Sequence, residues 1–270
     1  MCLNQKHKGP VLDLKIEIEA AFDASADGHI LQSYHHVFNE FIDKLNTGEI
    51  RAAEPVHGEW KVNIWVKKGI LLGFRIGTLM DYSIPSAFPF FDKSTFPLKP
   101  LSMDDGVRIV PGGSSVRNGV YLGKQVTCMP PMYINAGAYV DDGAMIDSHA
   151  LVGSCAQIGK QCHISAGSQI GGVLEPIGSV PVIIEDHVLV GGNCGLYEGV
   201  VVQSGAIIGA GTILTGGTPV YDIVNDCIYR KTPEKPLIIP KNAVVVPGSR
   251  PLKRQHGLGE NLSLYTPVIV

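Results

Sequence analysis

The chain has 270 residues, of which 45% are hydrophobic and 17% are charged, and its formal net charge is −3. This balance excludes a strongly basic nucleic-acid-binding protein and a cationic membrane-surface protein. No run approaches the roughly 20 apolar residues of a membrane span, and no apolar stretch follows the N-terminal charges as a signal peptide requires. The 32 glycines and the 7% of aromatic residues favour a β-rich, turn-rich fold.

The first hundred residues predict a mostly helical domain. Apolar residues recur at three- and four-residue spacing within 11–49, which is the pattern of a helical face, and Gly48 supplies a glycine stop. Two short strands are predicted next, because 59–66 alternates with a period of two and 70–76 is a second apolar run. The proline-rich stretch 80–105 predicts a loop-rich connector.

Small or β-branched apolar residues then fall at every sixth position, with two interruptions. The first is an inserted loop around residues 173–183. The second, residues 221–238, predicts a hairpin with Asn225 and Asp226 at its tip, after which the pattern returns near Ile239. The apolar anchors are Val116, Leu122, Cys128, Ile134, Val140, Ile146, Val152, Ile158, Ile164, Ile170, Ile184, Val190, Leu196, Val202, Ile208, Leu214 and Val220.

This spacing is the hexapeptide repeat of a left-handed parallel β-helix. Three hexapeptides make one triangular coil, whose anchors point inward and whose corners take turn-tolerant Gly, Asn and Asp. One coil cannot bury its apolar face alone, so only a stack of coils is stable. We therefore expect a mainly β protein with an N-terminal α/β helical domain at 1–105, a left-handed β-helix at 106–250 and a C-terminal segment at 251–270.

The six cysteines show neither a CxxC pair nor the spacing of a disulfide framework. Unpaired cysteines are typical of reducing compartments, so we expect free thiols and a cytoplasmic location. Cys194 as a nucleophile is disfavoured, because no neighbouring base is evident in the sequence. The cysteines are Cys2, Cys128, Cys155, Cys162, Cys194 and Cys227.

Several segments have sequences that the repeat itself does not require, so they are more specific for a family than the repeat is. In the coils they are Tyr139–Asp147, Val152–Lys160, Ile170–Pro176 and Ile183–Asp186, and in the N-terminal part they are Gly48–Glu54, Trp60, Trp65–Lys68 and Leu71–Ile76. Together these segments resemble the tetrahydrodipicolinate N-succinyltransferase family over nearly the whole chain.

The resemblance implies a homotrimer with active sites at subunit interfaces, without a resident cofactor or metal. It also implies transfer of an acyl group from acyl-CoA to the amine of 2-amino-6-oxopimelate, the opened form of tetrahydrodipicolinate. Arg108 matches an arginine that binds a substrate carboxylate. Asp147 matches an aspartate that contacts the substrate amine, and Glu198 matches a family glutamate.

Three departures from the family pattern leave the acyl donor open. Gly195 stands where the family has a glutamate, and Ser148 and His149 follow Asp147 where the family has Thr and Trp. The family continues past the position of Val270 with a basic tail. These differences predict a diverged member, such as the acyltransferase of tabtoxin biosynthesis, and both succinyl-CoA and acetyl-CoA remain candidate donors.

The proposed chemistry requires a carboxylate, because an alkyl ammonium has a pKa near ~10 and must lose a proton before it attacks a thioester. Asp147 is the first candidate for this role and Glu198 the second, while Arg108 is suited to a bidentate carboxylate contact. Backbone N–H groups at glycine-rich corners are candidates for binding the acyl-CoA and its oxyanion. These corner residues are Gly171, Gly172, Gly191, Gly209 and Ala210.

Three alternatives were weighed. A zinc site of His149, His163 and His187 is disfavoured, because their spacing does not match that of three-histidine sites in other β-helices. Acylation of a sugar amine or an antibiotic is disfavoured by the N-terminal segments. A catalytically silent scaffold or ligand-binding subunit is the remaining alternative.

Overall fold

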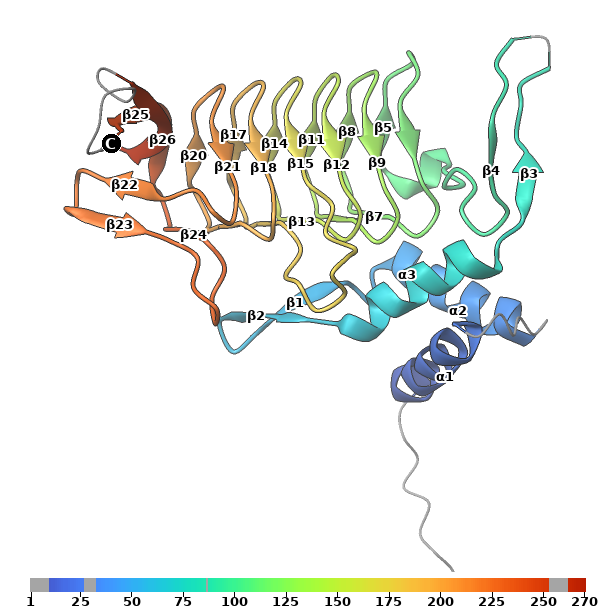
Figure 1. Cartoon of the computed structure of the whole chain (residues 1–270). Helices are drawn as coiled ribbons and strands as arrows, with labels where there is room; N and C mark the ends of the chain where they lie inside the picture. Colours follow the sequence, from blue (N-terminus) through green and yellow to red (C-terminus); the bar gives the residue numbers. More distant parts are fainter. Residues whose placement is uncertain (1–9, 27–32, 86, 253–261) are drawn as a thin grey trace, which may run out of the picture.

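A computed structural model describes residues 10–26, 33–85, 87–252 and 262–270. A stack of triangular coils forms the body of the molecule, and three helices pack beside it at the end where the stack begins (Figure 1). The C-terminus lies at the opposite end of the stack. The helices are α1 (Pro10–Ser25), α2 (Ser33–Thr47) and α3 (Ile64–Ile76). Between α2 and α3 lies an antiparallel pair, β1 (Ala53–Val56) and β2 (Glu59–Val62).

The strand predicted over 59–66 is confirmed only as β2, because α3 begins at Ile64, and the strand predicted over 70–76 is wrong, because this run belongs to α3. Short apolar runs do not separate buried strands from buried helices. Two glycines on one side of α3 explain the close packing against α2. A Cβ on Gly69 would lie 2.5 Å from the ring of Phe41, and one on Gly73 would lie 2.4 Å from the ring of Phe38. The helical prediction for 11–49 is confirmed where it is described, and residues 27–32 lie outside the described part.

The coils are built from three sheets, one on each side of the triangle, in which successive coils pair in parallel. We name them the covered face, the long face and the open face, in the order in which the chain visits them. The covered face contains β7 (Tyr121–Leu122), β10 (Tyr139–Val140), β13 (Gln157–Ile158), β16 (Ile183–Ile184), β19 (Val201–Val202) and β24 (Ile238–Ile239). The open face contains β6 (Ser115–Val116), β9 (Tyr133–Ile134), β12 (Leu151–Val152), β15 (Gln169–Ile170), β18 (Gly195–Leu196) and β21 (Ile213–Leu214).

The long face has ten strands and includes the end of the chain. Its coil strands are β5 (Arg108–Ile109), β8 (Thr127–Cys128), β11 (Met145–Ile146), β14 (His163–Ile164), β17 (Leu189–Val190) and β20 (Ile207–Ile208). Its remaining strands are β22 (Val220–Asp222), β23 (Cys227–Tyr229), β25 (Val244–Pro251) and β26 (Ser263–Ile269).

The strand register confirms the left-handed parallel β-helix. Tyr139 pairs with Tyr121 in the coil before and with Gln157 in the coil after. Every predicted anchor is buried, and the anchors form one continuous core along the stack. Each anchor therefore covers the anchor of the neighbouring coil, which is how the stack removes apolar surface from water.

Both interruptions of the repeat occur where the chain passes from the open face to the covered face. The first connects β15 to β16, and the second begins with the antiparallel pair β22–β23, as predicted. Figure 1 shows both loops on the side of the stack that faces β1 and β2. We call this edge the insertion corner. The C-terminal part does not end as a simple polar segment, because β25 and β26 pair antiparallel over Val245–Pro251.

The N-terminal domain packs on the covered face. Arg51 donates from Nε to Gln157 at 2.8 Å, and Trp60 donates from Nε1 to Glu185 at 2.9 Å. Lys67 of α3 is fully buried and donates from Nζ to the carbonyl of Ser179 in the first insertion. Burial lowers the pKa of Lys67. These contacts fix the helices and the insertion relative to the coils.

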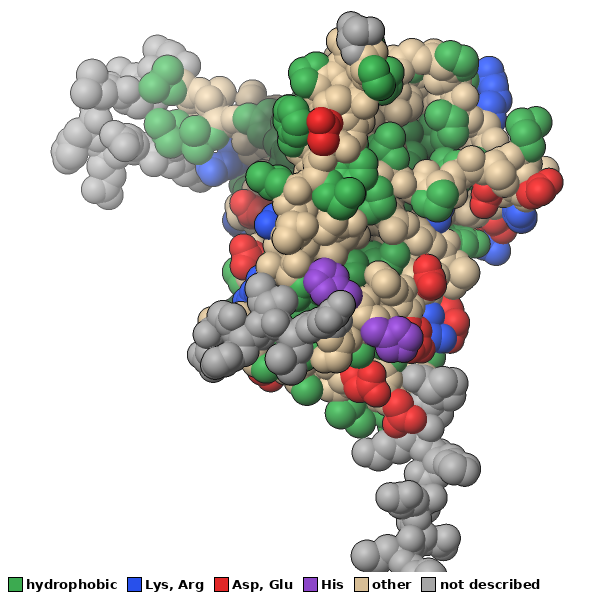
Figure 2. Space-filling model, turned by 90° about the vertical axis from the view of Figure 1, so that its right-hand side faces the viewer, with side chains coloured by type: hydrophobic (Ala, Val, Ile, Leu, Met, Phe, Trp, Pro, Cys, Tyr) green, Lys and Arg blue, Asp and Glu red, His purple; other side chains and the backbone are tan. Residues whose placement is uncertain are grey.

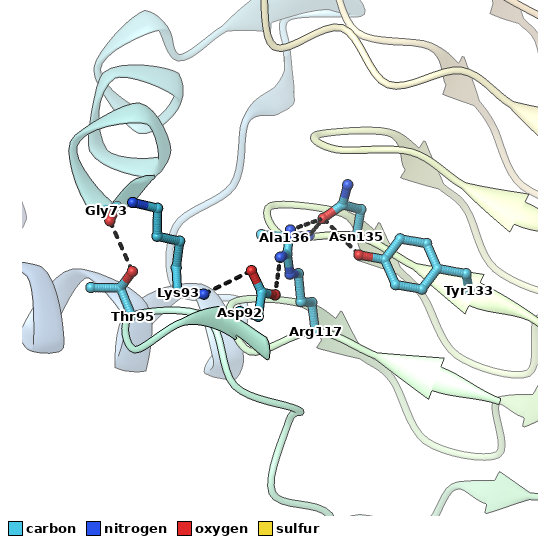
Figure 3. A network of polar contacts seen from close by, with 8 residues as sticks. All are labelled: Gly73, Asp92, Lys93, Thr95, Arg117, Tyr133, Asn135 and Ala136. Atoms are coloured by element: carbon cyan, nitrogen blue, oxygen red, sulfur yellow. Dashed lines mark hydrogen bonds and ion pairs between the residues drawn. The ribbon is translucent and has the colours of Figure 1, made fainter. Parts of the chain in front are cut away.

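An antiparallel hairpin of β3 (Leu79–Asp81) and β4 (Phe91–Lys93) projects beside the first coils. Arg117 joins it to the coils, forming an ion pair with Asp92 and donating to Asn135 at 3.2 Å (Figure 3). Its guanidinium also lies over the rings of Phe74 and Phe96. Hydrophobic side chains are spread over the upper half of this end of the molecule (Figure 2). The exposed ones on the hairpin are Leu79, Met80, Ile84, Phe88, Phe90 and Phe91.

Candidate active site

Asp147 lies directly after β11, where the chain turns from the long face to the open face. We call this edge of the stack the Asp147 corner. The Oδ1 atom accepts the N–H of Ser148 at 2.7 Å, which fixes the orientation of the side chain. The side chain is 30% exposed, and Oδ2 accepts no hydrogen bond from the described residues. One carboxylate oxygen thus remains available to a ligand.

Other aspartates at the corners behave differently. Asp142 accepts the backbone N–H of Lys124 at 2.8 Å, and Asp186 accepts that of Lys160 at 2.7 Å. Each of these carboxylates holds two successive coils together and satisfies a turn amide. Asp147 makes no such bond between coils, so its carboxylate is not needed to build the stack.

His163 is the nearest titratable partner of Asp147. It lies on β14, one coil further along, where it pairs with Met145 of β11. Its Nε2 is 3.7 Å from Oδ2 of Asp147, which is within ion-pair range but longer than a hydrogen bond. This Nε2 atom is buried and has no hydrogen-bond partner. His149 and His187 are exposed turn residues.

Sequence reasoning considered His163 only as a metal ligand and missed this contact. The repeat did carry the signal, because the position of His163 stacks on the strand that ends just before Asp147. The described residues contain no group of three His, Cys, Asp or Glu side chains placed to hold a metal ion.

Arg108 lies on β5, the first strand of the long face, and its side chain is exposed. It begins the outward column of stacked residues that continues with Thr127 and Met145. Two strand spacings, about 10 Å, therefore separate the backbone of Arg108 from that of β11. The described residues offer the guanidinium no hydrogen-bond or ion-pair partner. Arg108 thus presents an unpartnered cation on the long face, two coils before the carboxylate of Asp147 at the edge of that face.

Gly191, Gly209 and Ala210 continue the Asp147 corner through the following coils. The N–H of Gly191 donates to Ile208 and that of Gly209 donates to Val245, each at 2.7 Å, so these two amides are not free for an oxyanion. The N–H of Ala210, and that of Gly192 one coil before, have no acceptor among the described residues. A Cβ on Gly191 would lie 2.6 Å from the backbone nitrogen of Ala210, so the corner stays narrow only with glycine there.

The other predicted residues lie at a different edge. Gly171, Gly172 and Glu198 belong to the insertion corner, where they line a cavity of about 680 Å³ together with both inserted loops. The N–H of Gly171 donates to Leu196 at 2.8 Å. Glu198 is exposed and accepts the N–H of Gly216 at 3.0 Å. One chain therefore does not bring Glu198 to Asp147, and the predicted residues form two separate groups.

Gly195, where the resemblance leads us to expect a glutamate, is buried on β18. Tyr197 lies over it, and its hydroxyl group donates to Oε1 of Gln169 at 3.3 Å. Tyr197 also lines the cavity at the insertion corner. A phenol therefore occupies the outer surface at this position, a feature that the repeat pattern does not reveal.

Two further cations of the first coils and the thiol of Cys194 have structural roles. Lys124 donates to the carbonyls of Asp104 and Asp105, and Arg117 is held in the hairpin contact described above. The Sγ of Cys194 lies 3.1 Å from the carbonyl of Gly209, and burial raises the pKa of this thiol, so it is a poor nucleophile. The cysteines of the described part are free. No described helix combines the length and hydropathy needed to span a bilayer.

Comparison with known proteins gives two matches to family models. Residues 13–76 match the model of the tetrahydrodipicolinate N-succinyltransferase N-terminal region, and residues 181–216 match the hexapeptide repeat of succinyl-transferase. A solved structure from Campylobacter jejuni, described as a putative 2,3,4,5-tetrahydropyridine-2-carboxylate N-succinyltransferase, aligns with 87% of this chain and 62% of its own. Its TM-score of 0.49 and identity of 16% are too low to carry an argument.

Curated relatives cover most of the chain. The 2,3,4,5-tetrahydropyridine-2,6-dicarboxylate N-succinyltransferase of Rickettsia conorii is 43% identical over 269 residues, which are 94% of this chain and 91% of the relative. The protein of the same name from Idiomarina loihiensis is 40% identical over 238 residues, 85% of this chain and 80% of the relative.

The stacked coils and these relatives place the protein in the class of hexapeptide-repeat acyltransferases. Within that class, the chain belongs to the tetrahydrodipicolinate N-succinyltransferase family.

Proposed function

We propose that this protein transfers an acyl group from acyl-CoA to the amine of 2-amino-6-oxopimelate or a close analogue, within lysine and diaminopimelate biosynthesis or a tabtoxin-type pathway. The observation that carries the proposal is the Oδ2 of Asp147, which accepts no hydrogen bond from the described residues, at the edge of the face that carries the unpartnered guanidinium of Arg108. A carboxylate can bind the substrate ammonium, while the guanidinium binds an adjacent carboxylate. An α-amino acid carries both groups.

The acyl-CoA would lie along the Asp147 corner, beside Gly191, Gly209 and Ala210. The narrow, side-chain-poor backbone there allows close approach of an extended pantetheine arm. The amides of Gly192 and Ala210, which are unused in the described structure, are candidates for hydrogen bonds to the thioester oxygen. CoA would act as a co-substrate and leave after each turnover.

A homotrimer is part of the proposal. Asp147 and Glu198 lie at different corners of one chain, so a site that contains both must take them from two copies. The long and open faces also expose large apolar side chains outside the helical domain, namely Leu189, Ile207 and Ile213. Contact between copies through these faces would bury that surface. We place the assembled enzyme in the cytoplasm, where CoA thioesters are available.

Succinyl-CoA is the donor implied by the names of the relatives, and acetyl-CoA is a second candidate. The second is favoured by the expected loss of a charge pair, since Asn193-Cys194-Gly195 stands where the resemblance implies Arg-Ser-Glu, and by the aromatic ring of Tyr197 over Gly195. An acetyl group is smaller, and it does not require a cation for a distal carboxylate.

Release of CoA thiol during incubation with each donor tests the proposal. The acceptors are 2-amino-6-oxopimelate and, as a control, an analogue without the amine. We expect turnover that needs the amine, and the ratio of kcat/KM values for the two donors decides between them. A large preference for succinyl-CoA would eliminate the acetyl candidate. Absence of turnover with every pair would favour a silent scaffold instead.

A further inference from the structure

We infer that His163 is a positioning residue that holds the proton which Asp147 takes from the substrate ammonium. This inference rests on the proposed function, because it concerns the proton transfer of that reaction. Its geometric basis is the pair formed by Oδ2 of Asp147 and Nε2 of His163, which are 3.7 Å apart on neighbouring coils.

Three observations set this pair apart from an ordinary surface contact. The second oxygen of Asp147 is already bonded to Ser148, which aims Oδ2 away from the turn. The Nε2 atom is buried without a partner, although the side chain of His163 as a whole is 41% exposed. A buried polar atom without a partner costs free energy. A hydrogen bond that Nε2 forms only during the reaction would explain why the structure keeps this atom unpartnered.

The chemistry explains the need for a second group. A carboxylic acid ordinarily titrates near ~4 and an imidazole near ~6.5. A carboxylate alone therefore holds a proton poorly at neutral pH, whereas an imidazole holds it well and releases it readily. Substrate cannot reach the buried Nε2 directly, so the proton must pass through Asp147.

The reaction begins with His163 in its Nδ1–H tautomer. The ammonium gives one proton to Oδ2 of Asp147, which passes it to Nε2 of His163, leaving a neutral amine beside a carboxylate and an imidazolium. The amine nitrogen bonds to the thioester carbon, and the C–S bond breaks as CoA thiolate leaves. The thiolate takes the second proton from the new amide nitrogen. The imidazolium releases its proton to water, which restores the pair.

Among the described residues, no other titratable side chain stacks directly on this pair. Met129 and Ser165 lie one coil before and after Asp147, and Met145 and Leu189 lie one coil before and after His163. The other titratable groups of this region are Arg108, further along the same face, and His149 at the turn after Asp147. A pH effect that depends on His163 should therefore be separable from other titrations by mutation.

The test compares His163→Gln with His187→Gln. Glutamine fits both places, because Gln157 and Gln169 occupy outward strand positions like that of His163. Gln125 and Gln161 already occupy the positive-φ corner position that His187 shares. Steady-state kcat and KM for the amine are measured between pH 5.5 and 8.5, together with melting temperature.

For His163→Gln we expect kcat to fall by about 30-fold or more, with KM for the amine and the melting temperature little changed. The pH profile of kcat should differ between the wild type and His163→Gln, and His187→Gln should keep the wild-type profile. The variant His187→Gln should retain wild-type values. A normal kcat and pH profile in His163→Gln would overturn the inference and leave the proposed function intact, whereas an inactive wild type would remove both.

A second measurement does not need turnover. At constant pH, Asp147→Asn should shift the ring NMR resonances of His163 and leave those of His187 in place. Unmoved His163 resonances would show that the two side chains do not interact, which would also overturn the inference.

Discussion

Gly195 and Tyr197 occupy one shared space on the outer surface of β18. A Cβ atom on Gly195 would lie 2.5 Å from Cε2 of the Tyr197 ring and 2.9 Å from its hydroxyl oxygen. Gly171, one coil earlier, makes room on the other side, where a Cβ would lie 2.9 Å from Cδ1 of the same ring. The ring of Tyr197 in this position thus requires glycine at both places.

Replacing Gly195 with Glu should destabilise the protein by about 2 kcal/mol, because the new side chain overlaps a packed ring. The double variant Gly195→Glu with Tyr197→Val should recover most of this loss. Urea unfolding measures both effects. Gly178→Ala is a suitable control, since nothing lies within 4 Å of a Cβ at that site. Equal stability of the single and double variants would show that the two residues are independent.

Asp147→Ala should lower kcat by about 10²- to 10⁴-fold, the usual contribution of a general base, with little change in stability. Asp142→Ala is the matched control, because Asp142 bonds the backbone of Lys124. It should cost about 1 kcal/mol of stability and leave the kinetics close to those of the wild type. Near-normal turnover of Asp147→Ala would remove Asp147 from the mechanism.

Arg108→Gln should change acceptor binding, whereas Arg117→Gln should change stability. Loss of the unpartnered Arg108 should raise KM for the acceptor by roughly 10- to 100-fold, the worth of a charge-assisted hydrogen bond, without lowering the melting temperature. Loss of Arg117 should lower stability by about 2 kcal/mol, because it leaves Asp92 unpaired. Acceptor kinetics and thermal unfolding of both proteins give the comparison, and an unchanged KM in Arg108→Gln would contradict its role.

Burial raises the pKa of the Cys128 thiol from 9.0 to about 12. As the pH rises, the unfolded chain loses this proton first, so the unfolded state gains stability relative to the folded state. The contribution of the buried thiol is therefore full below pH 9.0 and decreases as the pH rises toward 12. At pH 10 the expected loss is about 1.4 kcal/mol.

Urea unfolding of the wild type and of Cys128→Ala at pH 8 and pH 10 provides the measurement. The stability difference between the two proteins should be smaller at pH 10, because alanine has no proton to lose. The cavity left by the substitution is the same at both pH values and cancels in the comparison. An unchanged difference would show that the folded thiol titrates at its ordinary value.

The repeat made the coils predictable, because each anchor position repeats the same physical requirement for a buried apolar side chain. The segment Ile64–Ile76 was less predictable, since its helical state depends on Phe38 and Phe41 packing against two glycines far along the chain. The candidate roles of Arg108 and Asp147 came from family resemblance, and the register then placed Arg108 on the long face and Asp147 at its edge, two coils apart. The separation of Glu198 from Asp147 followed from the order of the faces, which the linear sequence does not display.

Tyr197 and His163 show why the remaining features were missed. The position of the Tyr197 ring depends on the rotamer of a side chain at a corner. The six-residue period is the same for every rotamer, so it does not predict this position. The contact between His163 and Asp147 depends on an atomic distance between neighbouring coils. The residue spacing predicts only that the two residues lie on neighbouring coils.

The contact between Lys67 and Ser179 spans 112 residues of sequence, and this has a consequence for the order of folding. The ammonium group finds its acceptor only in a loop that follows several complete coils. During synthesis, the N-terminal helices leave the ribosome long before that loop does, and they cannot reach their final state alone. Completion of the first insertion, and of the cavity wall it forms, is therefore a late event of high contact order. A truncated chain that ends before Ser179 should carry a buried ammonium without its acceptor.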